Sequence, residues 1–172
     1  MMAVSSRPRA AKPRSANPRA TDPRAASQLA RQIICLRVEH ELCEGNADAL
    51  AEVMDARMRA AIPLPCSVVL DLSATPALDD CVSAALQSLH QLLAGSLVHL
   101  WLVLPGVQAR AAFLSCCAGE AIGPDSIHTS VRTAMLAAYA NLPGAALVTS
   151  AHREFLAQPP ELLAVPDWSS PP

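Results

Sequence analysis

The stretch VVLDLSATPALDDCVSAAL, residues 68–86, decides how this chain folds. An apolar run meets an aspartate at Asp71, and two further acids, Asp79 and Asp80, stand just before apolar residues at helical spacing. A short apolar run that ends in turn-forming residues predicts a buried strand, and the spacing behind it predicts an amphipathic helix. The three carboxylates therefore form a phosphate site, a metal site, or only the polar ends of a strand and a helix.

The same alternation of strand and helix patterns extends in both directions from this stretch. We expect strands at residues 33–38, 67–73 and 97–104, a short edge strand around 127–128, and helices at 46–62, from about 82 to 95, at 107–114 and at 130–140. Strands that alternate with helices predict βαβ units on a largely parallel sheet.

The length of 172 residues suits a single domain with a tail at each end. We place the domain at residues 31–142. Residues 143–172 return to proline, serine and isolated apolar residues, which indicates a C-terminal tail that is only partly ordered. Residues 1–30 form a proline-rich and arginine-rich tail, which we expect to be disordered.

The N-terminal tail is basic, whereas the rest of the chain is acidic. Residues 1–27 hold six basic residues and one acid, a net charge of +5, and the remainder carries −7. Pro-Arg pairs recur every five residues in this tail. We interpret the tail chiefly as a solvated linker; the alternative is an electrostatic arm for an acidic partner, for nucleic acid or, through weak contact, for anionic lipid.

Composition restricts the possible functions. Aromatic residues make up only 3% of the chain, so base stacking and specific nucleic-acid binding are not expected. Six cysteines without a CxxC pattern indicate a reduced protein and no zinc site. No apolar run reaches the roughly 18 residues needed to cross a bilayer, and no secretory signal is visible. We therefore expect a cytoplasmic protein.

Catalytic chemistry finds little support in the residues. The VVLDLSATP segment looks like the strand and loop that carry the acceptor aspartate of phosphoryl-accepting receiver domains, with Asp71 as the acceptor. That chemistry needs a lysine, and the only lysine, Lys12, lies in the tail. None of the five histidines forms a recognisable motif with a serine or a cysteine, and we interpret His90 and His99 as packing positions. We expect no enzymatic activity, no cofactor and no metal.

Residues 67–140 resemble the STAS domain, the α/β module of anti-sigma-factor antagonists and of the cytoplasmic part of SulP-type anion transporters. The signature is a strand that ends in DLS, a short loop, an aspartate followed by small residues, and a helix. The segment LRVEHELCEGNADAL, residues 36–50, is more similar to the SulP branch, in which an asparagine opens the first helix; Asn46 matches it. The segment IGPDSIHTSVRTAM, residues 122–135, is also similar to that branch.

This resemblance implies a small mixed, largely parallel sheet with about four helices packed mainly on one side. It also implies a non-catalytic module that binds partners. In the sigma-factor branch the loop aspartate is followed by a serine that a partner kinase phosphorylates. Asp79 matches that aspartate, Asp80 stands at the acceptor serine, and Cys81 and Val82 fall where a small hydroxyl residue and a glycine are common.

Asp80 cannot be phosphorylated by a serine kinase, but it places a fixed negative charge where a phosphoserine would be. We call Asp79, Asp80 and Cys81 the regulatory turn. The turn is either locked in a phospho-like state or no longer a switch, and Val82 is expected to add bulk on the partner side, which favours the second reading. The simplest alternative is that one of the two acids caps the helix and the other interacts with its dipole.

The leading functional expectation is a regulatory module that binds another protein, such as a membrane transporter, and that is membrane-associated only through that partner. The second expectation is a partner-switching protein that binds a regulatory kinase or an anti-sigma factor. A third is a domain that senses a nucleotide or another small molecule, although no sequence feature indicates a pocket. The identity of the partner and the oligomeric state do not follow from the sequence.

Overall fold

The computed structural model describes residues 31–39, 42, 47–75, 78–143 and 163–164. In chain order its elements are β1 (Ile33–Arg37), α2 (Ala47–Ala60), β2 (Ser67–Asp71), α3 (Asp80–Gly95), β3 (His99–Val103), α4 (Val107–Leu114), α5 (Cys117–Ile122), the 3-10 helix η1 (Pro124–Ser126), β4 (Ile127–His128), α6 (Val131–Ala140) and β5 (Leu163–Ala164). The predicted α/β class and the predicted order of strands and helices are confirmed.

The strands form a single sheet in the order β4-β3-β2-β1-β5, and every pair of neighbours is parallel. The predicted edge strand at 127–128 is confirmed as β4. β5 lies in the predicted C-terminal tail and pairs with β1, so the sheet extends past the expected domain boundary at residue 142. The strand directions that the structure describes are all parallel, rather than mixed.

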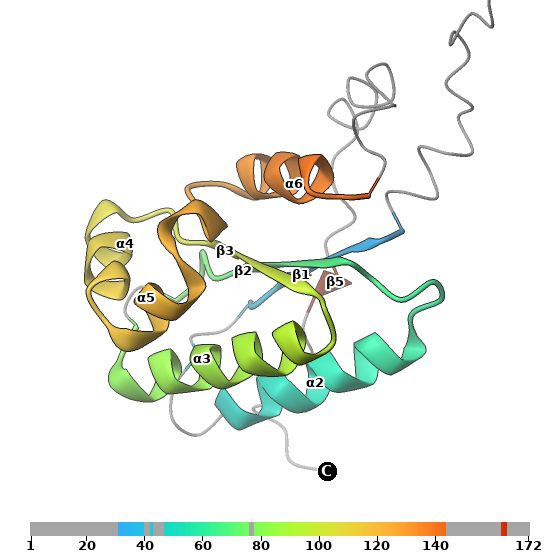
Figure 1. Cartoon of the computed structure of the whole chain (residues 1–172). Coiled ribbons are helices and arrows are strands. Elements are labelled where there is room, and N and C mark those ends of the chain that lie inside the picture. Colours follow the sequence, from blue (N-terminus) through green and yellow to red (C-terminus); the bar gives the residue numbers. More distant parts are fainter. Residues whose placement is uncertain (1–30, 40–41, 43–46, 76–77, 144–162, 165–172) are drawn as a thin grey trace, which may run out of the picture.

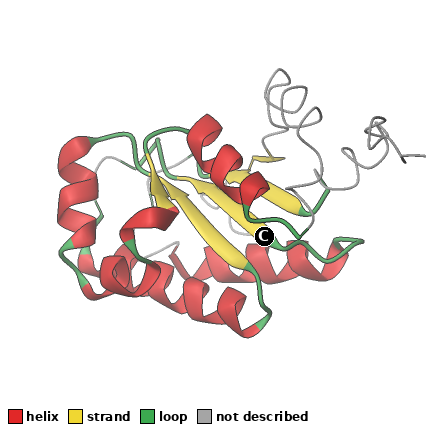
Figure 2. Cartoon of the chain, turned by 45° about the horizontal axis from the view of Figure 1, so that its top comes forward, coloured by secondary structure: helices red, strands yellow, loops and turns green. Residues whose placement is uncertain are grey.

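Helices cover the two faces of the sheet unequally (Figure 1). α2 and α3 lie along one face, with α4 and α5 at its end, and α6 lies on the opposite face. Figure 2 shows α6 lying over the strands. Five α-helices are seen in the described residues instead of about four, because α5 was not predicted. Packing mainly on one side is as expected.

Alternate strand residues feed two hydrophobic clusters, one on each face. Val68 and Leu70 point into the cluster formed with α2, α3, α4 and α5, whereas Val69 points into the cluster formed with α6. Both sets are almost fully buried, as expected for a parallel sheet with helices on both faces. The larger cluster fixes the start of α3, where the regulatory turn lies.

Polar side chains cap helix starts in the described part of the chain. Ser130 caps α6, and its hydroxyl accepts a hydrogen bond from the backbone N–H of Thr133 at 3.2 Å. Asn46, the predicted cap of α2, lies outside the described residues, as does the tail of residues 1–30. In the described part of the chain, no helix combines the length and the apolar character that a membrane span requires.

Candidate functional site

The candidate site lies at the carboxyl edge of the sheet. Because β1, β2 and β3 are parallel, their carboxyl ends meet at this edge, and the chain that leaves β2 runs through a short loop to the start of α3. In open parallel sheets this edge is where loops bind ligands and partners. The end of β2 and the start of α3 carry all three carboxylates of the 68–86 stretch.

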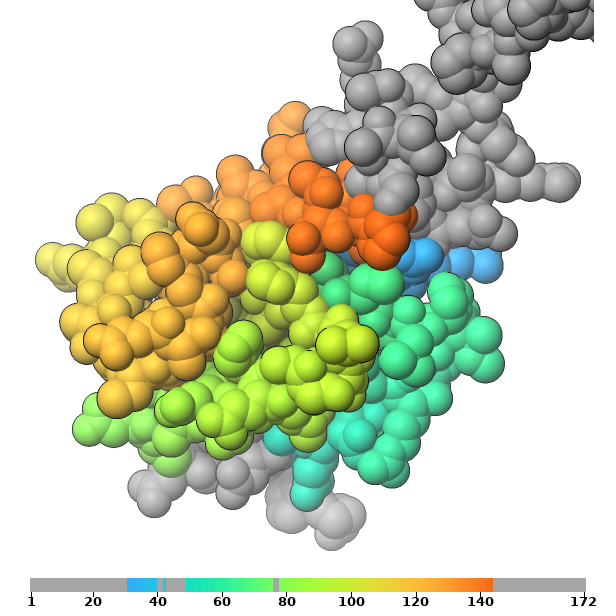
Figure 3. All heavy atoms as spheres, viewed as in Figure 1, coloured from blue at the N-terminus to red at the C-terminus, as the bar shows by residue number. Residues whose placement is uncertain are grey.

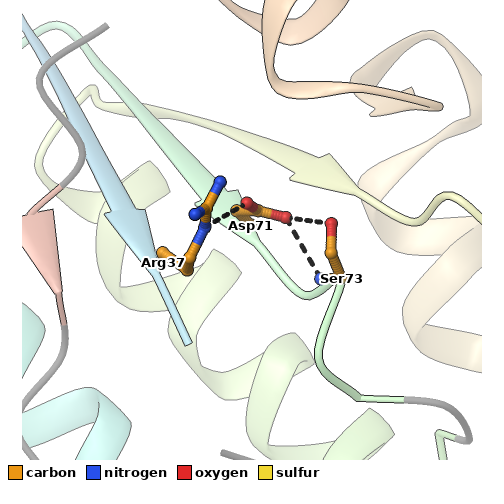
Figure 4. Close-up of polar contacts among 3 residues, drawn as sticks. All are labelled: Arg37, Asp71 and Ser73. Atoms are coloured by element: carbon orange, nitrogen blue, oxygen red, sulfur yellow. Dashed lines mark hydrogen bonds and ion pairs between the residues drawn. The ribbon is translucent and has the colours of Figure 1, made fainter. Parts of the chain in front are cut away.

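Asp71 ends β2 as a buried carboxylate that is held from two sides (Figure 4). Its side chain is 1% exposed, and its Oδ2 accepts a hydrogen bond and ion pair from Arg37 Nε at 2.9 Å. Its Oδ1 accepts from the backbone N–H of Ser73 at 3.1 Å and from the Ser73 hydroxyl. A carboxylate in this position fixes the direction in which the chain leaves the strand.

The loop after Asp71 is tied to the neighbouring segment of the chain. The backbone N–H of Thr75 donates to the Leu72 carbonyl at 3.0 Å, which closes a tight turn. The buried Thr75 hydroxyl accepts from the backbone N–H of Leu42 at 3.4 Å. These bonds join the segment after β1 to the loop after β2, and residues 76–77 lie outside the described part.

The regulatory turn begins α3. Asp79 is the helix N-cap: its Oδ1 accepts from the backbone N–H of Val82 at 2.7 Å, and its backbone is extended. Asp80 is the first helical residue and is exposed, and Cys81 is half-buried. The expectation that one acid caps the helix is confirmed for Asp79, and Asp80 lies in the first turn, where the helix dipole favours a negative charge.

Val82 does not add bulk at the partner side, and that expectation is wrong. Its side chain is 0% exposed and belongs to the larger hydrophobic cluster, next to Leu86 and Leu89 in α3. Helical spacing places residues 82, 86, 89 and 93 on one buried stripe. Val82 is therefore not in a position to block a partner. The exposed residues of the regulatory turn are Asp79 and Asp80.

The three carboxylates do not form one chemical site. Asp71 is engaged by Arg37 and Ser73, whereas Asp79 is engaged by the backbone of α3. Among the described residues, no three side chains of the histidine, cysteine, aspartate and glutamate types are grouped so that they could hold a metal ion. A buried, ion-paired Asp71 is also poorly placed to meet a phosphoryl donor. This agrees with the sequence, whose only lysine, Lys12, lies in the N-terminal tail.

A second polar cluster lies on the α6 face of β3 and β4. His99 Nε2 is hydrogen-bonded to Ser126 Oγ at 3.0 Å, and the Trp101 ring lies 4.2 Å from the His99 ring and 5.5 Å from the His128 ring. Burial, together with the nearby His90, lowers the pKa of His99, and burial lowers the pKa of His128. His99 is thus a hydrogen-bonded packing residue, as interpreted from the sequence.

Cys35 is not a reactive thiol. Burial, and to a smaller extent the Asp71 carboxylate, raise the pKa of Cys35 to about 12, although Arg37 acts in the opposite direction. The thiol is therefore protonated at neutral pH and unsuited to act as a nucleophile.

Sequence reasoning missed one residue of the site, Arg37. The β1–β2 register pairs Ile33 with Ser67 and Arg37 with Asp71, so both residues end their strands side by side. The signal was present, because two short apolar runs end in residues of opposite charge, Arg37 and Asp71. Whether the two charged residues lie side by side depends on the register between β1 and β2, which the sequence pattern does not predict.

Comparison with known proteins identifies the architecture. The family model described as the STAS domain matches residues 25–134. The fold is similar to that of a sulfate transporter family protein from Wolinella succinogenes, with a TM-score of 0.53 and 15% sequence identity over 62% of this chain and 84% of that chain. No curated protein matches the sequence significantly.

Proposed function

This chain belongs to the STAS domain family, and from that premise we propose that it is a non-catalytic regulatory module that binds another protein at the carboxyl edge of its sheet. The observation that carries the proposal is the regulatory turn. The Arg37–Asp71 pair holds the end of β2 and the Asp79 cap holds the start of α3, where the exposed carboxylate of Asp80 lies. The cap is made by Asp79, and no hydrogen bond of the Asp80 side chain is seen among the described residues.

Electrostatics makes Asp80 suitable for recognition. Asp79 is occupied as a cap, so the change of Asp80 to a neutral residue alters the outward charge of the turn but leaves the cap in place. Its negative charge is stabilised by the helix dipole and remains accessible to a cationic partner group. The site therefore suits a partner that reads a permanent negative charge, where related modules carry a phosphorylatable serine.

Two partner classes fit this surface. The likeness in fold to a sulfate transporter family protein favours a membrane transporter as the partner. The match between Asp80 and the acceptor serine of anti-sigma-factor antagonists supports a regulatory kinase or anti-sigma factor as the second candidate. The protein would act in the cytoplasm in either case.

The test compares three variants in co-purification with quantitative mass spectrometry. Asp80→Asn should lower recovery of the bound partner about tenfold, while the free energy of unfolding changes by only a few tenths to about 1 kcal/mol. Asp79→Ala should cost about 1 kcal/mol of stability through loss of the cap. Glu120→Gln, which neutralises an exposed acid in the first turn of α5, is the matched control and should leave recovery unchanged.

The identity of the recovered species separates the candidates. An integral membrane protein supports the first candidate, an ATPase-type kinase supports the second, and a tightly bound nucleotide would point to small-molecule sensing. Equal recovery with Asp80→Asn and Glu120→Gln would show that the regulatory turn is not the binding surface.

A further inference from the structure

Three large aliphatic side chains are exposed at the end of the molecule opposite the regulatory turn. Ile62 is 92% exposed, Leu64 is 60% exposed and Leu97 is 92% exposed. We call these three residues the amino-edge patch. Single exposed aliphatic residues are ordinary on a protein surface, but this group is concentrated in two neighbouring loops.

The sheet register places both loops at the same edge. Ile62 and Leu64 lie in the loop that enters β2, and Leu97 lies in the loop that enters β3. Ser67 pairs with His99 at the start of these parallel strands, and the His99 backbone N–H donates to the Cys66 carbonyl at 2.9 Å. The two loops therefore project side by side from the amino edge of the sheet.

The backbone at Leu97 is unfavourable for a leucine. Its φ is 59°, in the left-handed region that glycine and asparagine adopt far more readily. Its side chain contributes nothing to the two hydrophobic clusters, since it is almost fully exposed. Folding alone does not explain a leucine at this position, whereas contact with an apolar phase outside the molecule does.

Basic residues also lie at this edge. The Gln32 carbonyl accepts hydrogen bonds from the backbone N–H groups of Cys66 and Ser67, so Arg31 and Gln32 lie beside the loop that enters β2. Residues 1–27 carry a net charge of +5, and Arg31 is exposed where the described chain begins.

The C-terminal turn of α2 adds two more arginines at this edge, Arg57 and Arg59, of which Arg59 is paired with Asp55. Figure 3 shows the chain entering β2 (green) close to the first described residues (blue) at the right-hand edge. Aliphatic loop tips and basic groups thus share the edge of the sheet that lies away from Asp79 and Asp80.

We propose that the amino edge of the sheet docks on the surface of an anionic phospholipid bilayer, with the amino-edge patch inserted among the headgroups and the basic residues on lipid phosphates. Small aliphatic insertions combined with basic residues are the chemistry of such peripheral attachment. Three side chains on two loop tips are much less than a stable protein–protein interface needs, which disfavours a folded partner here. This surface is separate from the regulatory turn, so the two sites can be occupied together.

Vesicle co-sedimentation of the full chain tests the proposal. The protein should bind vesicles of phosphatidylcholine with about one third phosphatidylserine, and it should bind pure phosphatidylcholine vesicles at least about tenfold less well. An Ile62→Ser, Leu64→Ser and Leu97→Asn variant should lose about tenfold in affinity. Val107→Ser is the matched control, because Val107 is 73% exposed at the opposite edge, and it should bind like the wild type.

Two further variants test the aliphatic and the basic contributions to binding separately. Leu97→Asn alone suits the positive φ, so it should fold at least as well as the wild type and still bind more weakly. Replacement of the arginines in the four Pro-Arg pairs by glutamine should weaken binding and reduce its salt dependence; these arginines are Arg9, Arg14, Arg19 and Arg24.

Several outcomes would overturn the proposal: equal binding to both kinds of vesicle, undiminished binding by the patch variants, or an equal loss with Val107→Ser. Binding to native membranes but not to protein-free vesicles would show a membrane protein as the receptor and would also overturn it. None of these results bears on Asp80, so failure here is distinct from failure of the proposed partner site.

Discussion

At the scale of single residues, the most consequential contact is the ion pair between Arg37 and Asp71. The two side chains differ in environment, since Asp71 is 1% exposed and Arg37 is 45% exposed. A carboxylate removed from water requires compensating partners, and Arg37 and Ser73 supply them. Arg37 therefore compensates for the loss of hydration of the buried Asp71 carboxylate, whereas the half-exposed Arg37 depends less on Asp71.

Arg37→Met should lower the free energy of unfolding by about 1–3 kcal/mol, because it leaves the buried carboxylate with Ser73 only. Arg59→Met is the matched control: it breaks an ion pair whose side chains are 79% and 40% exposed, and it should cost about 0.5 kcal/mol or less. Urea denaturation measures both changes. Equal costs for the two substitutions would contradict this account of Asp71.

Asp79, Val82 and Arg37 differ in how well the local sequence predicts their role. The cap at Asp79 was predictable, because an acid before a helical apolar stripe satisfies nearby backbone N–H groups. Val82 was misjudged because a position matched to a family pattern was treated as surface, although its own spacing places it on the buried stripe. Arg37 required the register between strands, which is a long-range property.

At the scale of elements, the junction between α4 and α5 depends on one glycine. A Cβ atom at Gly119 would lie 2.0 Å from the Phe113 carbonyl oxygen and 2.7 Å from the Leu114 Cα. These neighbours are backbone atoms, so they cannot move aside as a flexible side chain can. The close approach allows α5 to pack against α3 and bury Ala118 and Ile122.

Gly119→Ala should destabilise the protein by about 2–3 kcal/mol, because the added methyl group forces the two helices apart. Gly95→Ala is the comparison: outside its own helix backbone and chain neighbours, no described atom lies within 4 Å of the added Cβ. The change should be neutral or stabilising by up to about 1 kcal/mol. Thermal and urea unfolding would report both. A Gly119→Ala variant as stable as the wild type would mean that α4 and α5 can move apart freely.

Two short elements, α5 and β5, were not predicted from the sequence, although the two-residue strand β4 was. α5 has six residues and β5 has two, which is too few for a hydrophobic period to be recognised. The longer elements were placed within a few residues, because each has a full apolar stripe or run. The position of β5 follows from pairing with β1 and not from any local pattern.

At the scale of the whole molecule, the sheet separates two hydrophobic clusters with different chemistry. The cluster under α2 and α3 is aliphatic except for Phe113, whereas the cluster under α6 contains Trp101 and Tyr139 beside the His99–His128 group. The titratable groups with lowered pKa values near neutrality therefore lie on one face, and pH should act on that face first.

The pH dependence of stability follows from His99 and His128, whose pKa values lie below 6.5 in the folded protein. The unfolded chain binds more protons than the folded one once the pH falls to about 6.5, so the free energy of unfolding should decrease from about pH 7.5 to pH 5.5. Urea titrations across that range measure the slope. A His99→Gln, His128→Gln variant should flatten it, and an unchanged slope would assign the effect to other groups.

The position of β1 has a consequence for synthesis on the ribosome. Among the described strands β1 is made first, yet its second neighbour, β5, is made last, well after the residues that complete β2 and β3. Until residues 163–164 emerge, one side of β1 is an unpaired strand edge of the kind that invites wrong pairing. The nascent protein thus remains open on that side until residues 163–164 have been made, even though the strands on the other side can already assemble.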